Sequence, residues 1–419
     1  MSIIPQSKQK KSSKASLLSR LAKSILLKKL ASIEIGSLTI HVEGEIHNFG
    51  HSNVENEPDA VIYIQDMRVF SCLLLQGDPA AGTAYIDGWW QTDNLLDVLT
   101  LFTLNQDTLF KFKDGFSMLA KYLNYLFSLV QKNTHSGSKK NILAHYDIGN
   151  DLYELFLDSK MMYSSAYYRH AEDDLETAAE YKLKHICEKL QLNNNDHVIE
   201  IGTGWGGFAI YAVQNYGCRI TTTTISDAQY EYAKQRIEEC QLEDRITLVQ
   251  KDYRTLEGEY DKLVSIEMIE AVGHQYLDEY FKTCNKLLKP DGIMLVQAIT
   301  ISDYLYADYI YTVDFIRKYI FPGGCLTSMS AMLSSCARYT TLTPYHSESF
   351  ACSYARTLDD WHQRFIQQQQ EIYRLGYNDE FIRLWEYYLK YCQAGFETRV
   401  IDIQQLVLKK PQNRITHQR

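Results

Sequence analysis

The stretch His197-Val-Ile-Glu-Ile-Gly-Thr-Gly-Trp-Gly-Gly207 decides the fold of this chain. An apolar run over 197–201 passes directly into a glycine-rich turn and then into an apolar helical pattern from about Phe208. A strand, a glycine turn and a helix in this order bring the backbone close to a ligand at the carboxyl end of the strand. We therefore expect a nucleotide-like ligand at this turn. Glycines that serve only tight helix packing are the alternative.

Alternating strands and helices follow this turn. Strand-like runs over 220–224, 246–248 and 262–266 are separated by helical segments, one of which starts at about Ala228. Such alternation implies a parallel sheet with helices on both faces. The sequence thus predicts an α/β, Rossmann-like domain for this part of the chain.

The residues before this domain have the pattern of a smaller α+β domain. Its β-like runs cover 37–42, 60–64, 69–75 and 83–86. Two segments with apolar residues at helical spacing follow, at 95–104 and 109–129, before a polar stretch. The predicted divisions are a basic, partly amphipathic segment (1–32), the α+β domain (33–130), a linker (131–140) and the α/β domain (141–419).

Composition and charge limit the function classes. The chain has 419 residues, a net charge of −9 and no apolar run long enough to cross a bilayer. Neither an integral membrane protein nor a nucleic-acid binder is therefore expected. The first 30 residues hold eight basic and no acidic side chains, with leucines at helical spacing. This segment can sit on an anionic membrane surface, or it can be a solvated tail.

Cysteine usage and the N-terminus indicate the compartment. The nine cysteines are scattered and contain no CxxC pair, so neither a metal site nor a disulfide framework is predicted. The N-terminus lacks a clean apolar stretch followed by a small-residue cleavage site. We expect a cytoplasmic protein without a bound metal, associated peripherally with the inner face of the membrane.

Two details distinguish the ligand of the glycine turn. A dinucleotide site needs an acidic residue about 20 residues further on, at the end of the second strand. Here that strand ends in Thr222-Thr-Thr-Ile-Ser226, without a carboxylate. Glu200, just before the first glycine, would repel a pyrophosphate but can orient the ammonium group of an amino-acid moiety. The pattern favours S-adenosylmethionine (SAM) over a dinucleotide.

Six separated segments carry a resemblance to a known family. They are His145–Asp151, Met161–Tyr167, Glu200–Gly207, Thr224–Ser226, Glu267-Met-Ile-Glu-Ala-Val-Gly273 and Tyr319–Leu326. The chain resembles the cyclopropane fatty acid synthases, a family of class I SAM-dependent methyltransferases, strongly over about 140–419. The resemblance is weaker over about 36–104, where Tyr85-Ile-Asp-Gly-Trp-Trp90 resembles the N-terminal domain of full-length bacterial members. It implies a catalytic domain at 141–419 and a lipid-binding domain at 33–130.

By position, the resemblance implies two sets of site residues. Those around SAM are Tyr163, Ser164, Glu200, Gly202, Gly204, Trp205, Gly206, Thr224, Ser226, Gln229, Tyr253 and Arg254. Those around a catalytic bicarbonate ion are Ser165, Glu270, Gln297, Ile299 and Tyr354. Ring closure requires a base near an apolar pocket, and the resemblance gives that role to bicarbonate.

Three positions leave the chemistry open. Ser165 stands where the family commonly has cysteine, and Gln297 stands where it commonly has histidine. Plant-type relatives share the glutamine, so this departure need not abolish activity, but it leaves the final proton transfer open. Cys392 matches a cysteine that is sometimes regarded as the active-site residue of the family. A cysteine that packs as a small hydrophobe is the physical alternative.

The predicted function is SAM-dependent transfer of a methylene group to the cis double bond of an unsaturated phospholipid acyl chain, which forms a cyclopropane. Three alternatives stay open: a fatty-acyl C-methyltransferase that gives a methylene or methyl-branched chain, a small-amine N-methyltransferase, and a non-catalytic lipid-binding relative. The expected partner is unsaturated phospholipid at the membrane surface, with no nucleic acid. A homodimer is implied by the resemblance alone.

Overall fold

The computed structural model describes residues 16–51, 57–76, 79–110 and 149–414. The chain divides into two compact units. The first takes Met1–Leu123 and Asn378–Ala394, and the second takes Asn124–Tyr377 and Gly395–Arg419, as far as these are described. The predicted linker, most of the predicted helix at 109–129 and the first half of the basic segment lie outside the described residues. The division into four segments therefore stays a prediction.

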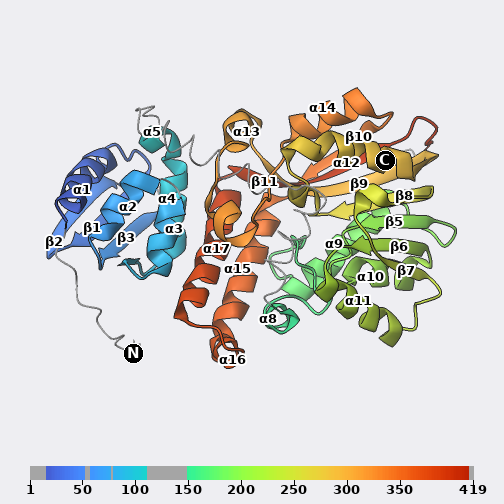
Figure 1. Cartoon of the computed structure of the whole chain (residues 1–419), viewed down its shortest axis with the longest axis horizontal. Coiled ribbons are helices and arrows are strands. Elements are labelled where there is room, and N and C mark those ends of the chain that lie inside the picture. Colours follow the sequence, from blue (N-terminus) through green and yellow to red (C-terminus); the bar gives the residue numbers. More distant parts are fainter. Residues whose placement is uncertain (1–15, 52–56, 77–78, 111–148, 415–419) are drawn as a thin grey trace. The chain divides into compact units, whose positions relative to one another are not determined.

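The first unit contains a four-stranded sheet in the order β2-β1-β3-β4, of which Figure 1 labels β1, β2 and β3. The strands are β1 (Gly36–Val42), β2 (Glu45–His51), β3 (Asp59–Ile64) and β4 (Trp90–Gln91). Strand β1 pairs antiparallel with β2 and parallel with β3, and its residues alternate between buried and half-buried, as in a sheet with one core-facing side. The helices are α1 (Leu17–Leu30), α2 (Arg68–Gln76), α3 (Pro79–Ile86), α4 (Leu95–Leu104) and α5 (Gln106–Phe110).

Two segments of this unit that were predicted as strands are helices. Residues 69–75 lie in α2, and residues 83–86 lie in α3. In α2, Val69, Phe70 and Cys72 are buried, which is not the alternation of a strand. A short apolar run has no period that separates a strand from a buried helix, and leucine and alanine favour the helix. The prediction of these two strands was wrong for that reason.

Part of helix α17 (Asp379–Glu397) also belongs to the first unit. Tyr85 donates a hydrogen bond to Glu386 Oε2 at 2.9 Å, and Arg383 Nε donates to Ile86 O at 2.7 Å. The rings of Tyr85 and Tyr387 lie 5.6 Å apart between centroids. The sequence grouped this helix with 141–419, because partners separated by 301 residues leave no local signal.

The second unit contains a seven-stranded sheet in the order β10-β11-β9-β8-β5-β6-β7. Its strands are β5 (His197–Ile201), β6 (Arg219–Thr224), β7 (Ile246–Gln250), β8 (Tyr260–Ile266), β9 (Leu288–Ile301), β10 (Thr343–Ser349) and β11 (Ile401–Lys409). Strands β5 to β9 are parallel, whereas β10 and β11 add an antiparallel edge. The predicted α/β, Rossmann-like sheet and its four predicted strands are confirmed.

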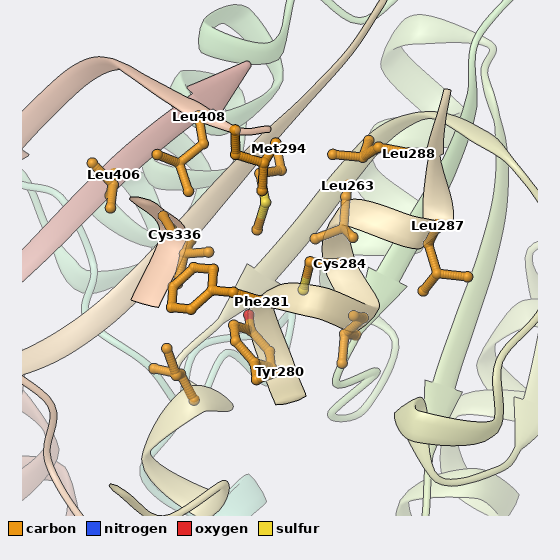
Figure 2. Close-up of a cluster of buried hydrophobic side chains, with 14 of the residues drawn as sticks. Leu263, Tyr280, Phe281, Cys284, Leu287, Leu288, Met294, Cys336, Leu406 and Leu408 are labelled. Atoms are coloured by element: carbon orange, nitrogen blue, oxygen red, sulfur yellow. The ribbon is translucent and has the colours of Figure 1, made fainter. Parts of the chain in front are cut away.

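Helices cover both faces of this sheet (Figure 1). The α-helices of this unit are α8 (Asn150–Glu154), α9 (Leu175–Leu190), α10 (Gly207–Tyr216), α11 (Asp227–Glu239), α12 (Leu277–Leu287), α13 (Asp303–Tyr309), α14 (Met329–Tyr339), α15 (Ala351–Gln367) and α16 (Gln369–Arg374), besides the end of α17. On one face, Tyr280 and Cys284 of α12 and Cys336 of α14 pack into a cluster with Met294 and Leu406 of the sheet, as Figure 2 shows.

Helices α9 and α10 pack on the opposite face. There they cover Val198 of β5, Val264 of β8 and Leu295 of β9. Successive side chains of a strand point to opposite faces, so Glu200 and Gln297, two residues beyond Val198 and Leu295, point toward α9 as well. The alternation therefore directs these two polar side chains toward the otherwise apolar side of α9, where the site forms.

Candidate functional site

The candidate site lies at the carboxyl ends of the parallel strands, where β5 is flanked by β6 on one side and β8 on the other. The chain leaves β5 toward β6 and β7 and then returns to β8 on the other side, so the strand order reverses between β5 and β8. Ligands of open α/β sheets bind at such a reversal. The glycine turn that follows β5 is therefore at the expected position for a ligand site.

The glycine turn has a left-handed backbone at three positions. The φ angles are +103° at Gly202, +53° at Gly204 and +86° at Gly206, which residues with a side chain rarely adopt. A Cβ at Gly202 would lie 3.1 Å from Met268 Cβ. At Gly204, in contrast, a Cβ would meet nothing of the described chain within 4 Å. The turn thus leaves the backbone bare at Gly204, which is what a closely approaching ligand needs.

Aromatic side chains support this turn. Trp205 is buried, and its Nε1 donates to Asn150 Oδ1 at 2.8 Å. Its ring lies 4.9 Å from that of Tyr153 and 6.3 Å from that of Tyr163 between centroids. Tyr163 in turn stacks on Trp361 at 5.4 Å. Trp205 and Tyr163, both predicted around SAM, therefore belong to one cluster of contacting aromatic rings.

A buried lysine lies among carboxyl groups beside the turn. Thr222 Oγ1 donates to Glu200 Oε2 at 2.6 Å, and Lys182 Nζ donates to Ser164 Oγ at 2.7 Å. Burial raises the pKa of Glu200 to about 8, against the effects of Thr222 and Lys182. Burial lowers the pKa of Lys182 to about 8, although Glu267 and two further carboxyl groups oppose that shift. Ser164 and Glu200, both predicted, thus share a polar cluster with a lysine that was not predicted.

The remaining residues predicted around SAM lie at the ends of β6 and β7. Thr224 Oγ1 donates to Gln229 Oε1 at 2.9 Å, and Ser226 caps α11 by accepting from Gln229 N at 3.3 Å. The guanidinium of Arg254 is held by the carboxylate two residues before it and lies 5.7 Å from the ring centroid of Tyr253. The structure therefore gathers the predicted SAM set at one end of the sheet of the second unit.

A second cluster centres on Glu267, which follows β8 directly. Its Oε1 accepts from Ser165 N at 2.9 Å and from Gln297 Nε2 at 2.8 Å, and its Oε2 accepts from Tyr354 Oη at 2.6 Å. Burial raises the pKa of Glu267, while the three donors and Lys182 oppose that rise. Three residues predicted around bicarbonate are thus brought together around a carboxylate that was not predicted.

Glu270 and Ile299, the other two residues predicted around bicarbonate, are also in contact. Ile299 N donates to Glu270 Oε1 at 2.5 Å, whereas Glu270 Oε2 is buried and has no hydrogen-bond partner among the described residues. Burial, together with the negative charge of Glu267, raises the pKa of Glu270 to about 8. Glu270 accepts one hydrogen bond and Glu267 accepts three, so Glu270 is the carboxyl group of the pair that more readily keeps its proton, and the donors around Glu267 favour its ionised form.

A chain of side chains fixes the orientation of Gln297. Lys189 Nζ donates to Gln405 Oε1 at 2.6 Å, and Gln405 Nε2 donates to Gln297 Oε1 at 2.9 Å. An ammonium group has protons to give and no lone pair, so Gln405 presents its oxygen to Lys189 and its amino group to Gln297. Gln297 must then present its own amino group to Glu267. The register of β9 and β11, which pairs Gln297 with Gln405, builds this chain.

Sequence reasoning missed three residues of this site. Glu267 begins a segment quoted for the resemblance, but only Glu270 received a role there. Gln405 offered no signal, because its partners come from other elements. Lys182 did offer one, since it interrupts the buried side of α9 formed by Ala178, Ala179, Leu183 and Ile186. A charged residue in an apolar stripe needs a buried partner, and that need points to a site.

Cys392 is not among the residues that the second unit brings together. It lies in the part of α17 that belongs to the first compact unit, and it is a thiol rather than half of a disulfide. Its catalytic role therefore stays a prediction.

Comparisons with known protein sequences identify similar proteins. The family model described as mycolic acid cyclopropane synthetase matches residues 133–406. The cyclopropane-fatty-acyl-phospholipid synthase of Escherichia coli K12 is 35% identical over 361 residues, which cover 85% of this chain and 90% of that protein. The tuberculostearic acid methyltransferase UfaA1 of Mycobacterium tuberculosis H37Rv is 33% identical over 341 residues, which cover 78% of each chain.

A solved structure is similar as well. The mycolic acid cyclopropane synthase CmaA1, complexed with SAH and CTAB, matches with a TM-score of 0.61 and 27% sequence identity. The match covers 65% of this chain and 98% of that chain.

Proposed function

The chain belongs to the family of SAM-dependent cyclopropane fatty acid synthases, and we propose on that premise how its residues build a cyclopropane on the cis double bond of an unsaturated phospholipid acyl chain. SAM is the cofactor. One observation carries the proposal for the site: Lys182 bonds to Ser164 and interacts electrostatically with both Glu200 and Glu267. The strand that leads into the glycine turn and the acidic cluster therefore share one buried cation.

The chain must protect and stabilise positive charge. Bound SAM supplies an electrophilic methyl group on a sulfonium sulfur. An isolated alkene is a weak nucleophile, so the protein has to align the double bond and exclude water from the cation that forms. The rings of Tyr163 and Tyr354 lie 5.4 and 6.2 Å from that of Trp361 between centroids. Aromatic faces of this kind stabilise a nearby cation without reacting with it.

A base must then remove a proton from the transferred carbon before the ring can close. The acidic cluster offers two carboxyl groups in unlike surroundings. Glu267 accepts hydrogen bonds from three donors, whereas Glu270 accepts one and keeps its proton at neutral pH. Paired carboxyl groups whose pKa values are pushed apart are suited to hold and accept protons separately.

Transfer of a labelled methyl group tests this function. The full chain is incubated with methyl-labelled SAM and with vesicles of cis-monounsaturated phospholipid, or of saturated phospholipid with the same head group. We expect label in the unsaturated lipid alone, and ring protons in the NMR spectrum of the product. The matched control is Gly204→Ala, which places a side chain at φ +53° on the bare side of the turn and should reduce transfer. Label in saturated lipid, or in none, would contradict the proposal.

A methyl-branched product is the second candidate. The 33% identity to a protein named tuberculostearic acid methyltransferase favours it. In this case the cation would lose a proton without ring closure, which gives an alkene that carries a methylene or methyl branch. A saturated methyl branch would additionally require a later reduction by a separate hydride donor. The same NMR spectrum separates the two outcomes, because a branch gives alkene or methyl signals and no cyclopropane signals.

We also propose that helix α1 contacts the phospholipid surface. Leu17, Leu21 and Ile25 are 87%, 59% and 44% exposed, and their spacing of four residues puts them on one side of the helix. Arg20 and Lys28 are exposed on the same helix. Exposed leucines beside basic side chains favour an anionic lipid surface. In the described part of the chain, no helix has the length and apolarity to span a membrane.

Vesicle flotation tests this contact. We expect the full chain to float with vesicles that contain anionic phospholipid, and Leu21→Glu with Ile25→Glu to reduce binding by about tenfold or more, because two buried apolar side chains are lost. Ser24→Glu with Ser32→Glu is the control, since it adds the same two negative charges at exposed positions in and just after the same helix without removing apolar surface. Equal binding of the double variant and the wild type would contradict the proposal.

Three further assignments rest on the family resemblance. They are lipid binding by 33–130, methyl transfer by 141–419, and a homodimer at the inner face of the membrane. Mass photometry of the full chain tests the dimer. A single species with the mass of one chain would contradict it.

A further inference from the structure

The site does not fit a bicarbonate ion. The resemblance would have Ser165, Gln297 and Tyr354 hold that ion. In the structure all three donate instead to the carboxylate of Glu267, at 2.9, 2.8 and 2.6 Å. A carboxylate and a bicarbonate ion each present two oxygens that share one negative charge, so the same donors cannot serve both. Glu267 thus already fills the position expected for the ion.

The donors around Glu267 are fixed by their own partners. Lys189 and Gln405 force the amino group of Gln297 toward Glu267, and the donor of Ser165 is its backbone N–H. Neither group can accept a hydrogen bond at this point. The acceptor that faces them must therefore supply lone pairs, and an ionised carboxylate does so from both oxygens.

Glu267 is held in this position against backbone strain. Its φ is +49°, a left-handed conformation that is unfavourable for a residue with a side chain. Glycine would adopt the same conformation without strain. Strain of this kind persists where the surrounding contacts over-determine the conformation, and it gathers at functional sites. The three hydrogen bonds to the carboxylate offset the strain, so the turn after β8 is built around this side chain.

We propose that the carboxylate of Glu267 takes the place of bicarbonate and is the base that closes the ring. The proposal rests on the proposed function. The Oε2 atom accepts a proton from the transferred methyl carbon, and the electron pair of the broken C–H bond forms the new C–C bond to the cationic acyl carbon. The ring product is then neutral at the reacting carbons, and Glu267 becomes a neutral carboxyl group. That proton passes to water before the next turnover, and no oxidant or reductant is required.

Of the two carboxyl groups in the cluster, Glu267 is better suited than Glu270 to act as the base. Glu270 keeps its proton at neutral pH, because burial and the charge of Glu267 raise its pKa to about 8. The three donors to Glu267 favour its ionised form, while burial raises its pKa above the ordinary value for glutamate. A base whose pKa lies nearer to the working pH is a better proton acceptor.

Bicarbonate binding tests the proposal without reference to activity. ¹³C-labelled bicarbonate is titrated into the full chain with SAH present, and binding is followed by broadening of its NMR signal. We expect no binding by the wild type. Glu267→Gly should bind the ion, because it removes the carboxylate, suits the backbone at φ +49° and leaves the donors of Ser165, Gln297 and Tyr354 available. Glu267→Gln keeps the side-chain volume and should not bind it.

Methyl transfer in CO₂-free buffer gives the second readout. Removing and restoring bicarbonate should change the wild-type rate less than twofold. Both Glu267 variants should be slower by on the order of 100-fold or more, the usual contribution of a general base. Bicarbonate at millimolar concentration should raise the rate of methyl transfer by Glu267→Gly at least tenfold. It should leave the rate of Glu267→Gln unchanged. Calorimetry should give each variant an SAH affinity within threefold of wild type, which shows that it is folded.

Several outcomes would overturn the proposal. Bicarbonate binding by the wild type, loss of wild-type activity without bicarbonate, or full activity of Glu267→Gln each would do so. If the wild type transfers no label to any lipid, the proposed function fails instead. In that case the binding titration still decides whether Glu267 occupies the position of the ion.

Discussion

Replacement of Tyr354 by phenylalanine removes one hydrogen bond from the base and leaves its surroundings in place. Tyr354 Oη lies 2.6 Å from Glu267 Oε2. Its ring stacks on Phe396 with the centroids 4.4 Å apart, a contact that phenylalanine keeps. The substitution therefore changes the charge state of Glu267 rather than the packing of α15.

The size of the effect follows from this single bond. A hydrogen bond to a charged group contributes about 1.5–3 kcal/mol, and about 1.4 kcal/mol corresponds to one pKa unit. Loss of a donor disfavours the carboxylate, so the pKa of Glu267 should rise by about one to two units. A smaller fraction of the base is then ionised below that pKa. The acid limb of kcat moves to higher pH by the same one to two units, the rate on that limb falls by about 10–100-fold, and the loss narrows as the pH rises above the pKa.

The assay is kcat for label transfer at saturating SAM between pH 6 and 9. The KM for SAM and the melting temperature are measured beside it, and both should stay close to the wild-type values. Tyr373→Phe, at a partly exposed position of α16, is the matched control and should leave the profile unchanged. A loss of equal size at every pH, or a profile identical to that of the wild type, would refute the reasoning.

Three other substitutions give independent tests. Gln405→Leu removes the donor that orients Gln297. The acid limb of kcat should therefore move about one pH unit higher, with unchanged SAM affinity. An acid limb at the wild-type pH would contradict the role of Gln405 in orienting Gln297. Glu270→Gln tests the pH dependence of stability. Folding raises the pKa of Glu270 from 4.5 to about 8, so this group adds its full contribution to the free energy of unfolding below pH 4.5, and the contribution is lost as the pH rises through 8. The melting temperature of the variant should therefore fall less than that of the wild type between pH 5 and 8. Parallel curves of melting temperature against pH would contradict this prediction. Gly207→Ala puts a Cβ 2.4 Å from Lys160 O and should cost about 1–3 kcal/mol, seen as a melting temperature lower by several degrees; no decrease would contradict it.

Local sequence was sufficient for the sheet of the second unit. The glycine turn after His197–Ile201 and the alternation of apolar runs with helical segments predicted parallel strands, and β5 to β8 are found at those runs. The signal is strong because a strand buried on both faces is continuously apolar and a connecting helix has its own period. In the first unit the same reasoning failed for 69–75 and 83–86, where short apolar runs form α2 and α3.

The resemblance of sequence segments located the site only in part. It assigned Ser165, Gln297 and Tyr354 to one anion, and the structure does bring these three together. It named bicarbonate as that anion and gave no role to Glu267, although Glu267 begins one of the segments that carry the resemblance. A family pattern assigns a role only to positions whose role in the family is known.

The sequence by itself determined which elements form the sheet and where the glycine turn lies, because both depend on residues that are adjacent or regularly spaced in the chain. Only the tertiary structure decided what fills the centre of the acidic cluster. The partners of Glu267 lie 30, 87 and 102 residues away, and no period of a helix or strand connects residues at such separations. The pairing of Gln297 with Gln405 arises from the register of β9 and β11. That register is a property of the folded sheet, so the orientation of the donors around Glu267 exists only once the chain has folded.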